Sequence, residues 1–226
     1  MSTGQDWGAK RAAAYDRRVR ELFPAYEELH AAALAAVTNN APPGARVLVI
    51  GAGTGYEAAA LARAGYQVTA LDPSGSMLEL ARSRPGAESV EFVEGTMEAL
   101  PSTPRYAAAM SILVMHFLPD DGAKEQYLKG AAARCVAGAN LVLADLVGEP
   151  GTDAFEKAFA DWGISLAEDS NPGAVERDVC KIREDVHFVP PERISALLNA
   201  CGLSAEGPVW RSGWLALWNA TKSRAQ

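Results

Sequence analysis

The sequence predicts an α/β fold built on a doubly wound, mainly parallel β-sheet. Three observations support this prediction. Short apolar segments alternate with helix-type segments between residues 46 and 146. The first apolar segment runs into three glycines spaced by one residue, in VLVIGAGTG at residues 47–55. The chain has 226 residues, 49% hydrophobic and 22% charged, which suits one globular domain with a full core. Strands that alternate with helices at this spacing are typical of parallel sheets covered on both faces.

The first 43 residues predict a helical cap. Residues 8–38 are rich in Ala, Leu, Glu and Arg. Pro24 divides them into two helices, one ending near Phe23 and the next starting beside the proline. The turn-rich segment NNAPPG at residues 39–44 closes the cap.

Residues 44–148 predict the central, cofactor-binding part of the sheet. Five apolar segments here are typical of strands, at residues 46–50, 67–71, 90–93, 106–113 and 140–146. Helices are expected between them, at residues 56–64, at 77–83, and from Pro119 to about Arg134. This order of elements is that of a parallel, doubly wound sheet.

The remaining chain predicts a lid and an antiparallel edge. Residues 149–190 form the lid, with a helix over residues 151–168 and irregular chain over residues 169–189, which contains Pro172 and Gly173. Residues 191–226 hold a helix over residues 191–200 and two strands near residues 203–209 and 214–220. A short turn at Ser212-Gly213 joins these strands as an antiparallel pair. The expected sheet therefore has seven strands, in a single domain over residues 1–226.

The composition excludes several classes of function. The net charge is −7 and the isoelectric point is about 5.1, whereas sequence-independent nucleic-acid binding needs a basic surface. The three cysteines are far apart, and no cluster has metal-ligand spacing. No apolar run reaches the roughly 18 residues that a membrane span requires, and the N-terminus lacks the apolar core of a secretory signal. We expect a cytoplasmic protein with no metal and no membrane or nucleic-acid partner.

The glycine-rich turn and the acidic residue after the second strand predict a nucleotide site. Glycines let the backbone approach a ligand closely, and the next helix presents its N-terminus to that ligand. Asp72, at the end of the second strand, can accept hydrogen bonds from ribose hydroxyls. Dinucleotides and adenosyl cofactors share this arrangement. Tyr56 stands where the dinucleotide pattern GxGxxG/A needs a small residue, which favours an adenosyl cofactor.

Four segments between residues 47 and 122 form an ordered set of motifs. They are VLVIGAGTGYEAAALARAG (47–65), VTALDPSGSMLELAR (68–82), VEFVEGTMEALP (90–101) and YAAAMSILVMHFLPDDG (106–122). In order and spacing, this set resembles the class I S-adenosylmethionine-dependent methyltransferases. The resemblance implies a Rossmann-like fold and S-adenosyl-L-methionine as the cofactor.

The same resemblance implies a set of cofactor-binding residues. They are Tyr26, Gly51, Ala52, Gly53, Gly55, Asp72, Pro73, Met77, Thr96, Met97, Ile112 and Leu113. In this set Asp72 takes the ribose position, Met77 packs on adenine, and Thr96 stands where the family often has Asp. Tyr26 enters through residues 19–34, which resemble the helical cap of carboxy-S-adenosylmethionine synthases of tRNA wobble modification, where a cap tyrosine touches the cofactor.

His116 is the candidate catalytic residue. It follows the fourth strand, at the edge where open α/β sheets bind ligands, and a neutral imidazole there can take a proton from a hydroxyl or amine. The alternative is a histidine packed beside Phe117. Asp145, at the end of the fifth strand, could bind an amine substrate or make a structural hydrogen bond. His30 is expected on the surface of the cap helix.

Aromatic residues of the cap and lid are the other candidates for substrate binding. Aromatic rings attract cations, and a lid of such rings would exclude water from a positively charged cofactor. The candidate substrate-binding residues are Tyr15, His116, Phe155, Phe159 and Trp162. The alternative for each ring is packing of the cap or lid onto the sheet.

These observations predict methyl transfer to a small-molecule acceptor through an oxygen or nitrogen nucleophile, by a monomer or a homodimer. Three alternatives stay open. They are a carboxy-S-adenosylmethionine synthase-like enzyme of tRNA modification, a non-catalytic S-adenosylmethionine-binding protein and an NAD-dependent oxidoreductase. The acceptor itself is set by the cap and by residues 150–190, where the motifs end.

Overall fold

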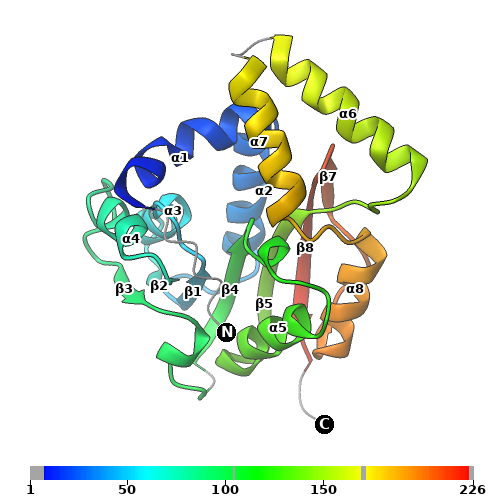
Figure 1. Cartoon of the computed structure of the whole chain (residues 1–226). Helices are drawn as coiled ribbons and strands as arrows, with labels where there is room; N and C mark the ends of the chain where they lie inside the picture. The colour runs from blue at the N-terminus through cyan, green and yellow to red at the C-terminus, as the bar shows by residue number, and fades with distance from the viewer. Residues whose placement is uncertain (1–7, 104, 169–171, 224–226) are drawn as a thin grey trace.

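The computed structural model describes residues 8–103, 105–168 and 172–223, and Figure 1 shows their arrangement around one sheet. The strands are β1 (Arg46–Ile50), β2 (Gln67–Asp72), β3 (Glu91–Glu94), β4 (Tyr106–Ile112), β5 (Cys135–Leu146), β6 (Leu203–Ser204), β7 (Trp210–Ser212) and β8 (Leu215–Lys222). The α-helices are α1 (Gly8–Leu22), α2 (Tyr26–Thr38), α3 (Tyr56–Arg63), α4 (Gly75–Arg82), α5 (Ala123–Arg134), α6 (Asp153–Glu168), α7 (Pro172–Asp185) and α8 (Pro191–Ala200). None of these described helices is long and apolar enough to cross a lipid bilayer.

The sheet has the strand order β3-β2-β1-β4-β5-β8-β6, and β7 pairs with β8 outside this path. Strands β1 to β5 are mutually parallel, and β8 is antiparallel to its neighbours. This confirms the predicted doubly wound sheet with an antiparallel C-terminal edge. The strand order reverses between β1 and β4, and ligands of open α/β sheets bind at the carboxyl ends of the strands at such a point.

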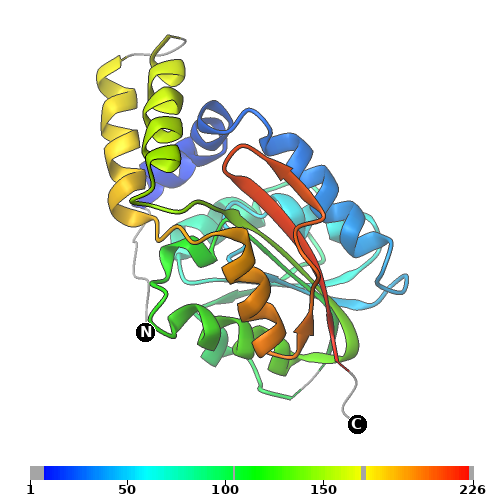
Figure 2. The ribbon, with the colours of Figure 1, turned by 90° about the vertical axis from the view of Figure 1, so that its right-hand side faces the viewer.

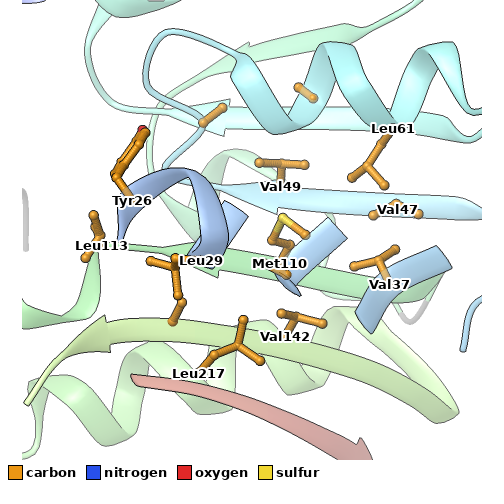
Figure 3. Close-up of a cluster of buried hydrophobic side chains, with 14 of the residues drawn as sticks. Tyr26, Leu29, Val37, Val47, Val49, Leu61, Met110, Leu113, Val142 and Leu217 are labelled. Atoms are coloured by element: carbon orange, nitrogen blue, oxygen red, sulfur yellow. The ribbon is translucent and has the colours of Figure 1, made fainter. Parts of the chain in front are cut away.

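Helices cover both faces of the sheet, because alternate residues of each strand point to opposite sides. On one face, Val49 of β1 packs with Met110 of β4 under helix α2, whose Leu29 and Val37 are fully buried (Figure 3). A fully buried aliphatic side chain contributes roughly 1.5–3 kcal/mol. This packing holds the cap helix α2 against this face of the sheet.

The opposite face carries a second core. Leu48 of β1 points to this side and packs with Leu128 of α5 and Leu198 of α8. The side chains of all three residues are 0% exposed. Helices therefore pack on both faces of the sheet, as expected for a doubly wound fold.

The C-terminal edge has one strand more than predicted, so the sheet has eight strands and the expected number of seven was wrong. The segment predicted as one strand over residues 203–209 is strand only at its start, in β6. A further short strand, β7, follows this segment, and the two strands pair with different parts of β8. Gly207 and Pro208 lie between them. Proline has no N–H to donate to a strand ladder, which interrupts the pairing at this point.

The lid region is more helical than predicted. Residues 169–189 were expected to be irregular, but α7 covers Pro172–Asp185. Proline fits the first turn of a helix, where its missing N–H has no intrahelical partner, so Pro172 begins this helix. Figure 2 shows α6 and α7 side by side, apart from the helices that cover the two faces of the sheet. The cap helix α1 lies at the same end of the molecule (Figure 1).

Candidate active site

Asp72 ends β2 and lies beside the glycine turn that follows β1. One carboxyl oxygen accepts the N–H of Gly53 and the other accepts the N–H of Ser74, both at 2.8 Å. Each oxygen keeps a further acceptor position, because a carboxylate oxygen has two lone pairs. Burial raises the pKa of Asp72, and the hydrogen bonds from Ser74 and Gly53 oppose that shift. The geometry suits a carboxylate that accepts hydrogen bonds from the hydroxyls of a ribose.

A cavity of about 90 Å³, here called the Asp72 cavity, adjoins this carboxylate. Its walls are formed by Tyr15, Gly51, Gly53, Asp72, Pro73, Met77, Ile112, Leu113, Val114 and Phe117. Most of the residues that the resemblance assigned to the cofactor are in this wall. The hydroxyl of Ser74 caps α4 by accepting the N–H of Met77 at 3.4 Å, which positions Met77 at the start of that helix. The glycine turn, the acceptor pair and an apolar wall together fit an adenosyl cofactor.

A second, smaller cavity of about 30 Å³ lies on the other side of the glycine turn, at the start of α3. We call it the α3 cavity. Its walls are formed by Tyr15, Tyr26, His30, Gly51, Ala52, Gly53, Thr54, Tyr56, Glu57, Ile112 and Leu113. Ala52 and Tyr26, both assigned to the cofactor from the sequence, therefore lie next to the glycine turn but in this separate pocket.

Three residues assigned to the cofactor lie outside the walls of these two cavities. Gly55 precedes α3, where its backbone packs closely on Ala81 of α4. The hydroxyl of Thr96 donates to the carboxylate of Glu98, and the side chain of Met97 is buried in the core beneath α5. Their contact with the cofactor stays a prediction.

A further cavity at this end of the sheet lies between α1 and α7 and has a volume of about 290 Å³. We call it the α1–α7 cavity. Its walls are formed by Ala14, Tyr15, Arg18, Val19, Leu22, Phe23, Leu113, His116, Phe117, Leu146, Asp178, Lys181, Ile182, Asp185 and Val186. Tyr15 and Leu113 belong to the walls of all three cavities. These two residues therefore mark the place where the three cavities meet.

Leu113 has an unusual backbone conformation at this junction. Its φ is +56°, the single positive value among the non-glycine residues that the structure describes. Its N–H donates to the carbonyl of Ala144 at 2.8 Å, which ties the end of β4 to β5. Such a conformation costs a non-glycine residue roughly 1–2 kcal/mol and is concentrated at functional sites. The strained residue lies where the ligand cavities join.

His116, in the wall of the α1–α7 cavity, forms a buried pair with Asp145. The ring nitrogen Nδ1 of His116 is hydrogen bonded to the carboxylate of Asp145. His116 is 5% exposed and Asp145 is 1% exposed. The same Asp145 oxygen also accepts the N–H of Leu146 at 2.8 Å. Of the two alternatives for Asp145, the structure shows a hydrogen bond within the protein, and it orients the imidazole of His116.

Lys124 of α5 lies near this pair. Its burial there was not expected from the sequence. It is 1% exposed, and its Nζ donates to the carbonyl of Met115, the residue before His116, at 2.9 Å. Burial lowers the pKa of Lys124, and the nearby carboxylates of Asp145 and Asp120 oppose that shift. The spacing to Leu128 was the sequence signal for this burial. Residues four positions apart share one face of a helix, and Leu128 lies on the inward face of α5.

The lid aromatics pack against the sheet. Phe155, Phe159 and Trp162 of α6 form one cluster with Phe188 and Trp214, with ring centroids 5.2–6.4 Å apart. None of the three α6 rings belongs to the wall of the α1–α7 cavity. Of the five candidate substrate-binding residues, the structure brings Tyr15 and His116 to this cavity. The other three hold the lid in place.

His30 is buried, so the expectation that it lies on the surface of the cap helix was wrong. It is 2% exposed, and its Nδ1 lies within ion-pair distance of the Glu57 carboxylate. The ring contacts Tyr26 with centroids 4.0 Å apart and Tyr56 with centroids 5.3 Å apart. Helix α2 turns this residue inward because the helix packs on the sheet through the same face.

Comparisons with known proteins agree with this geometry. Residues 47–138 match the family described as "Methyltransferase domain". No curated protein matches the sequence significantly. The matched segment includes the glycine turn, Asp72 and His116.

Solved structures show the same fold. A Burkholderia thailandensis 1,6-didemethyltoxoflavin-N1-methyltransferase, with its substrate and S-adenosylhomocysteine bound, is 17% identical over 96% of this chain and 87% of its own, with a TM-score of 0.60. A magnesium protoporphyrin IX methyltransferase from Synechocystis PCC 6803, with S-adenosylhomocysteine bound, is 16% identical over 97% of this chain and 98% of its own, with a TM-score of 0.68. A complex of the Haloferax volcanii Trm112 methyltransferase activator with a putative methyltransferase gives 16% identity over 97% of this chain and 99% of the other, with a TM-score of 0.66.

The family match, the strand order and the cavity beside Asp72 lead to one assignment. The cofactor is S-adenosylmethionine, and the protein is an enzyme. Residues 47–138 are similar to the methyltransferase domain family, and the chain has the fold of S-adenosylmethionine-dependent methyltransferases.

Proposed function

We propose that the enzyme methylates a hydroxyl or amine of a small, largely apolar acceptor that binds in the α1–α7 cavity. The observation that carries this proposal is the position of the His116–Asp145 pair. The His116 of this pair lies in the wall of a cavity that adjoins the Asp72 cavity and has room for a second ligand, about 290 Å³. The named substrates of two similar structures, 1,6-didemethyltoxoflavin and magnesium protoporphyrin IX, are also small molecules.

The charges of the α1–α7 cavity are paired with one another, which supports an uncharged acceptor. Arg18 of α1 forms an ion pair with Asp178 of α7. Lys181 of α7 forms another with Asp185, at 2.9 Å. The rest of the wall is mainly apolar, as in most small-molecule sites. An acceptor with an apolar body and one ionisable hydroxyl or amine matches these walls.

The protein's own contribution to the reaction is orientation and proton acceptance. Bound S-adenosylmethionine supplies an activated methyl group. Asp145 holds Nδ1 of His116, so Nε2 is the ring nitrogen that can take the proton of the attacking hydroxyl or amine. The proton ends on His116, and the pairing with Asp145 stabilises the resulting imidazolium. Tyr15 adds an aromatic ring at the junction of the cavities, where a positive charge is attracted to its face.

The test is a methyl-transfer assay with a panel of apolar phenols, alcohols and amines, read by S-adenosylhomocysteine release and product mass. His116→Gln should lower kcat by about 10²- to 10⁴-fold, the usual range for a lost general base, and leave the Kd of S-adenosylhomocysteine unchanged. His187→Gln is the matched control, because His187 is an exposed histidine in the lid region. An unchanged kcat in His116→Gln contradicts the assigned role. A carboxylated cofactor found by native mass spectrometry of the purified protein contradicts the proposed reaction.

A further inference from the structure

His30 and Glu57 form a buried polar pair in the α3 cavity that the proposed methyl-transfer step does not use. His30 is 2% exposed and Glu57 is 8% exposed. The two side chains lie within ion-pair distance, but neither ring nitrogen of His30 has a hydrogen bond of regular geometry among the described residues. Glu57 is the neighbour of Nδ1, so Nε2 is the ring nitrogen without a partner among the described residues. Buried polar groups in native proteins are nearly always hydrogen bonded, so this nitrogen indicates a missing partner.

The surroundings of this pair favour a cation. In the part of the chain that the structure describes, neither Glu57 nor Asp72 has a lysine or arginine within ion-pair distance. Asp16, a third carboxylate nearby, is already paired with Arg84. The pKa of the Tyr15 phenol reports this charge: it is raised by burial first, and then by the carboxylates of Glu57, Asp16 and Asp72. A ligand group that carries a positive charge is therefore stabilised among these residues.

The arrangement of the three cavities indicates which group that is. They meet at Tyr15 and Leu113. The Asp72 cavity fits the ribose, and the α1–α7 cavity fits the acceptor. The α3 cavity is next to the Asp72 cavity, because the glycine turn forms a wall of both. The part of the cofactor that still needs a place is its amino-acid end, which carries an ammonium and a carboxylate.

We propose that Glu57 and His30 bind the α-ammonium group of the cofactor's amino-acid end. The carboxylate of Glu57 can only accept hydrogen bonds, and a neutral imidazole offers one acceptor nitrogen, whereas an ammonium donates three hydrogens. The cavity volume of about 30 Å³ has room for one small polar group, because a water-sized group needs roughly 10–15 Å³ on the same measure. This inference rests on the adenosyl cofactor and not on the acceptor proposed above.

The aromatic neighbours of His30 provide a variant that keeps the packing. Tyr26 and Tyr56 contact the imidazole ring on two sides, in tilted and edge-on orientations. Phenylalanine at position 30 preserves an aromatic ring there and removes both nitrogens. Glu57→Gln keeps the size of the other partner and removes its charge. Loss of ligand binding in these two variants therefore reports polar contacts and not a collapsed cavity.

The test compares three ligands by calorimetry with the full-length protein. S-adenosylhomocysteine has the whole amino-acid end, decarboxylated S-adenosylmethionine keeps the amine alone, and 5′-methylthioadenosine has neither group. In His30→Phe and Glu57→Gln, the first two ligands should bind about 10- to 100-fold more weakly, the usual effect of losing hydrogen bonds to a charged group. The Kd of 5′-methylthioadenosine should stay within about twofold, because a ligand without the amine loses no contact.

Three outcomes overturn the proposal. One is unchanged binding of S-adenosylhomocysteine in both variants. Another is a parallel loss for all three ligands, which shows a structural role for the pair. The third is a loss confined to S-adenosylhomocysteine, which assigns the pair to the carboxylate instead. If the wild-type protein binds none of the three ligands, the cofactor assignment fails and not this inference.

Discussion

Replacing Gly51 by alanine should destabilise the turn that forms the wall of the cofactor site. Gly51 has a φ of +68°, in the left-handed region that glycine adopts without strain. An added Cβ would lie 2.3 Å from Cγ2 of Val114, in the loop after β4. The backbone conformation costs a non-glycine residue about 1–2 kcal/mol, and an overpacked methyl costs about 1–3 kcal/mol. The expected loss of unfolding free energy is therefore about 2–5 kcal/mol.

Gly53→Ala separates the two contributions. Gly53 also has a positive φ, +51°, but a Cβ there meets nothing within 4 Å. This variant should lose the backbone contribution alone, about 1–2 kcal/mol. Val114→Ala removes the side-chain atoms that clash with the methyl group introduced by Gly51→Ala. The double variant should therefore recover the steric part, a coupling of about 1–3 kcal/mol.

The assay is urea unfolding of the wild type, the three single variants and the double variant, followed by calorimetric titration with S-adenosylhomocysteine. Binding should weaken in Gly51→Ala and return partly in the double variant. The reasoning is refuted if Gly51→Ala loses no more stability than Gly53→Ala, or if Val114→Ala restores nothing. Either result would mean that the turn does not pack on Val114 as described.

Four further predictions concern the site and the core. Asp145→Asn should lower kcat by about 10²-fold or more with little change in the Kd of S-adenosylhomocysteine, because the imidazole loses its orienting carboxylate; an unaltered kcat would contradict this. Affinity for S-adenosylhomocysteine should fall as the pH is lowered through the pKa of Asp72, because the protonated group accepts fewer hydrogen bonds. Burial raises that pKa, so the fall should occur at a higher pH than for an ordinary aspartate. Asp72→Asn should show weak binding without this pH dependence in the same titrations. Arg18→Ala removes the partly exposed ion pair with Asp178, so it should change stability by less than about 1 kcal/mol and raise the KM of the acceptor, as steady-state kinetics will show. Leu29→Ala, at a fully buried position of α2, should cost about 2–5 kcal/mol in urea unfolding.

Local sequence signals predicted most of the sheet. Strands such as β1 and β4 are short apolar runs between turn residues, and each pairs with the strand that follows it along the chain. The predicted helices and strands were wrong where one local sequence pattern allows two structures. Pro172 can end a helical pattern or begin a helix, and the chain uses it to begin α7. The expected strand over residues 203–209 is shortened to β6, and the separate strand β7 after Gly207 and Pro208 is defined by its pairing with β8.

The residues of the site were also only partly predictable from local sequence. The glycine turn and Asp72 are predictable because one strand–turn–helix unit and the next strand end carry them. The pairs His116–Asp145 and His30–Glu57 join residues that are far apart in sequence, and no spacing rule links them. Lys124 belongs to the same class, since its burial follows from how α5 packs and not from its own residue type. Tertiary packing, and not local pattern, brings these side chains together.

The central claim is that the Asp72 carboxylate and the glycine turn hold an adenosyl cofactor. Calorimetric titration of the wild type and of Asp72→Ala with S-adenosylhomocysteine tests it most directly, with NAD as the comparison ligand. The account predicts binding to the wild type, no binding of NAD, and an affinity lower by about 10- to 100-fold in Asp72→Ala, as expected for lost hydrogen bonds to a charged group. Equal affinity of the two proteins for S-adenosylhomocysteine would contradict the account.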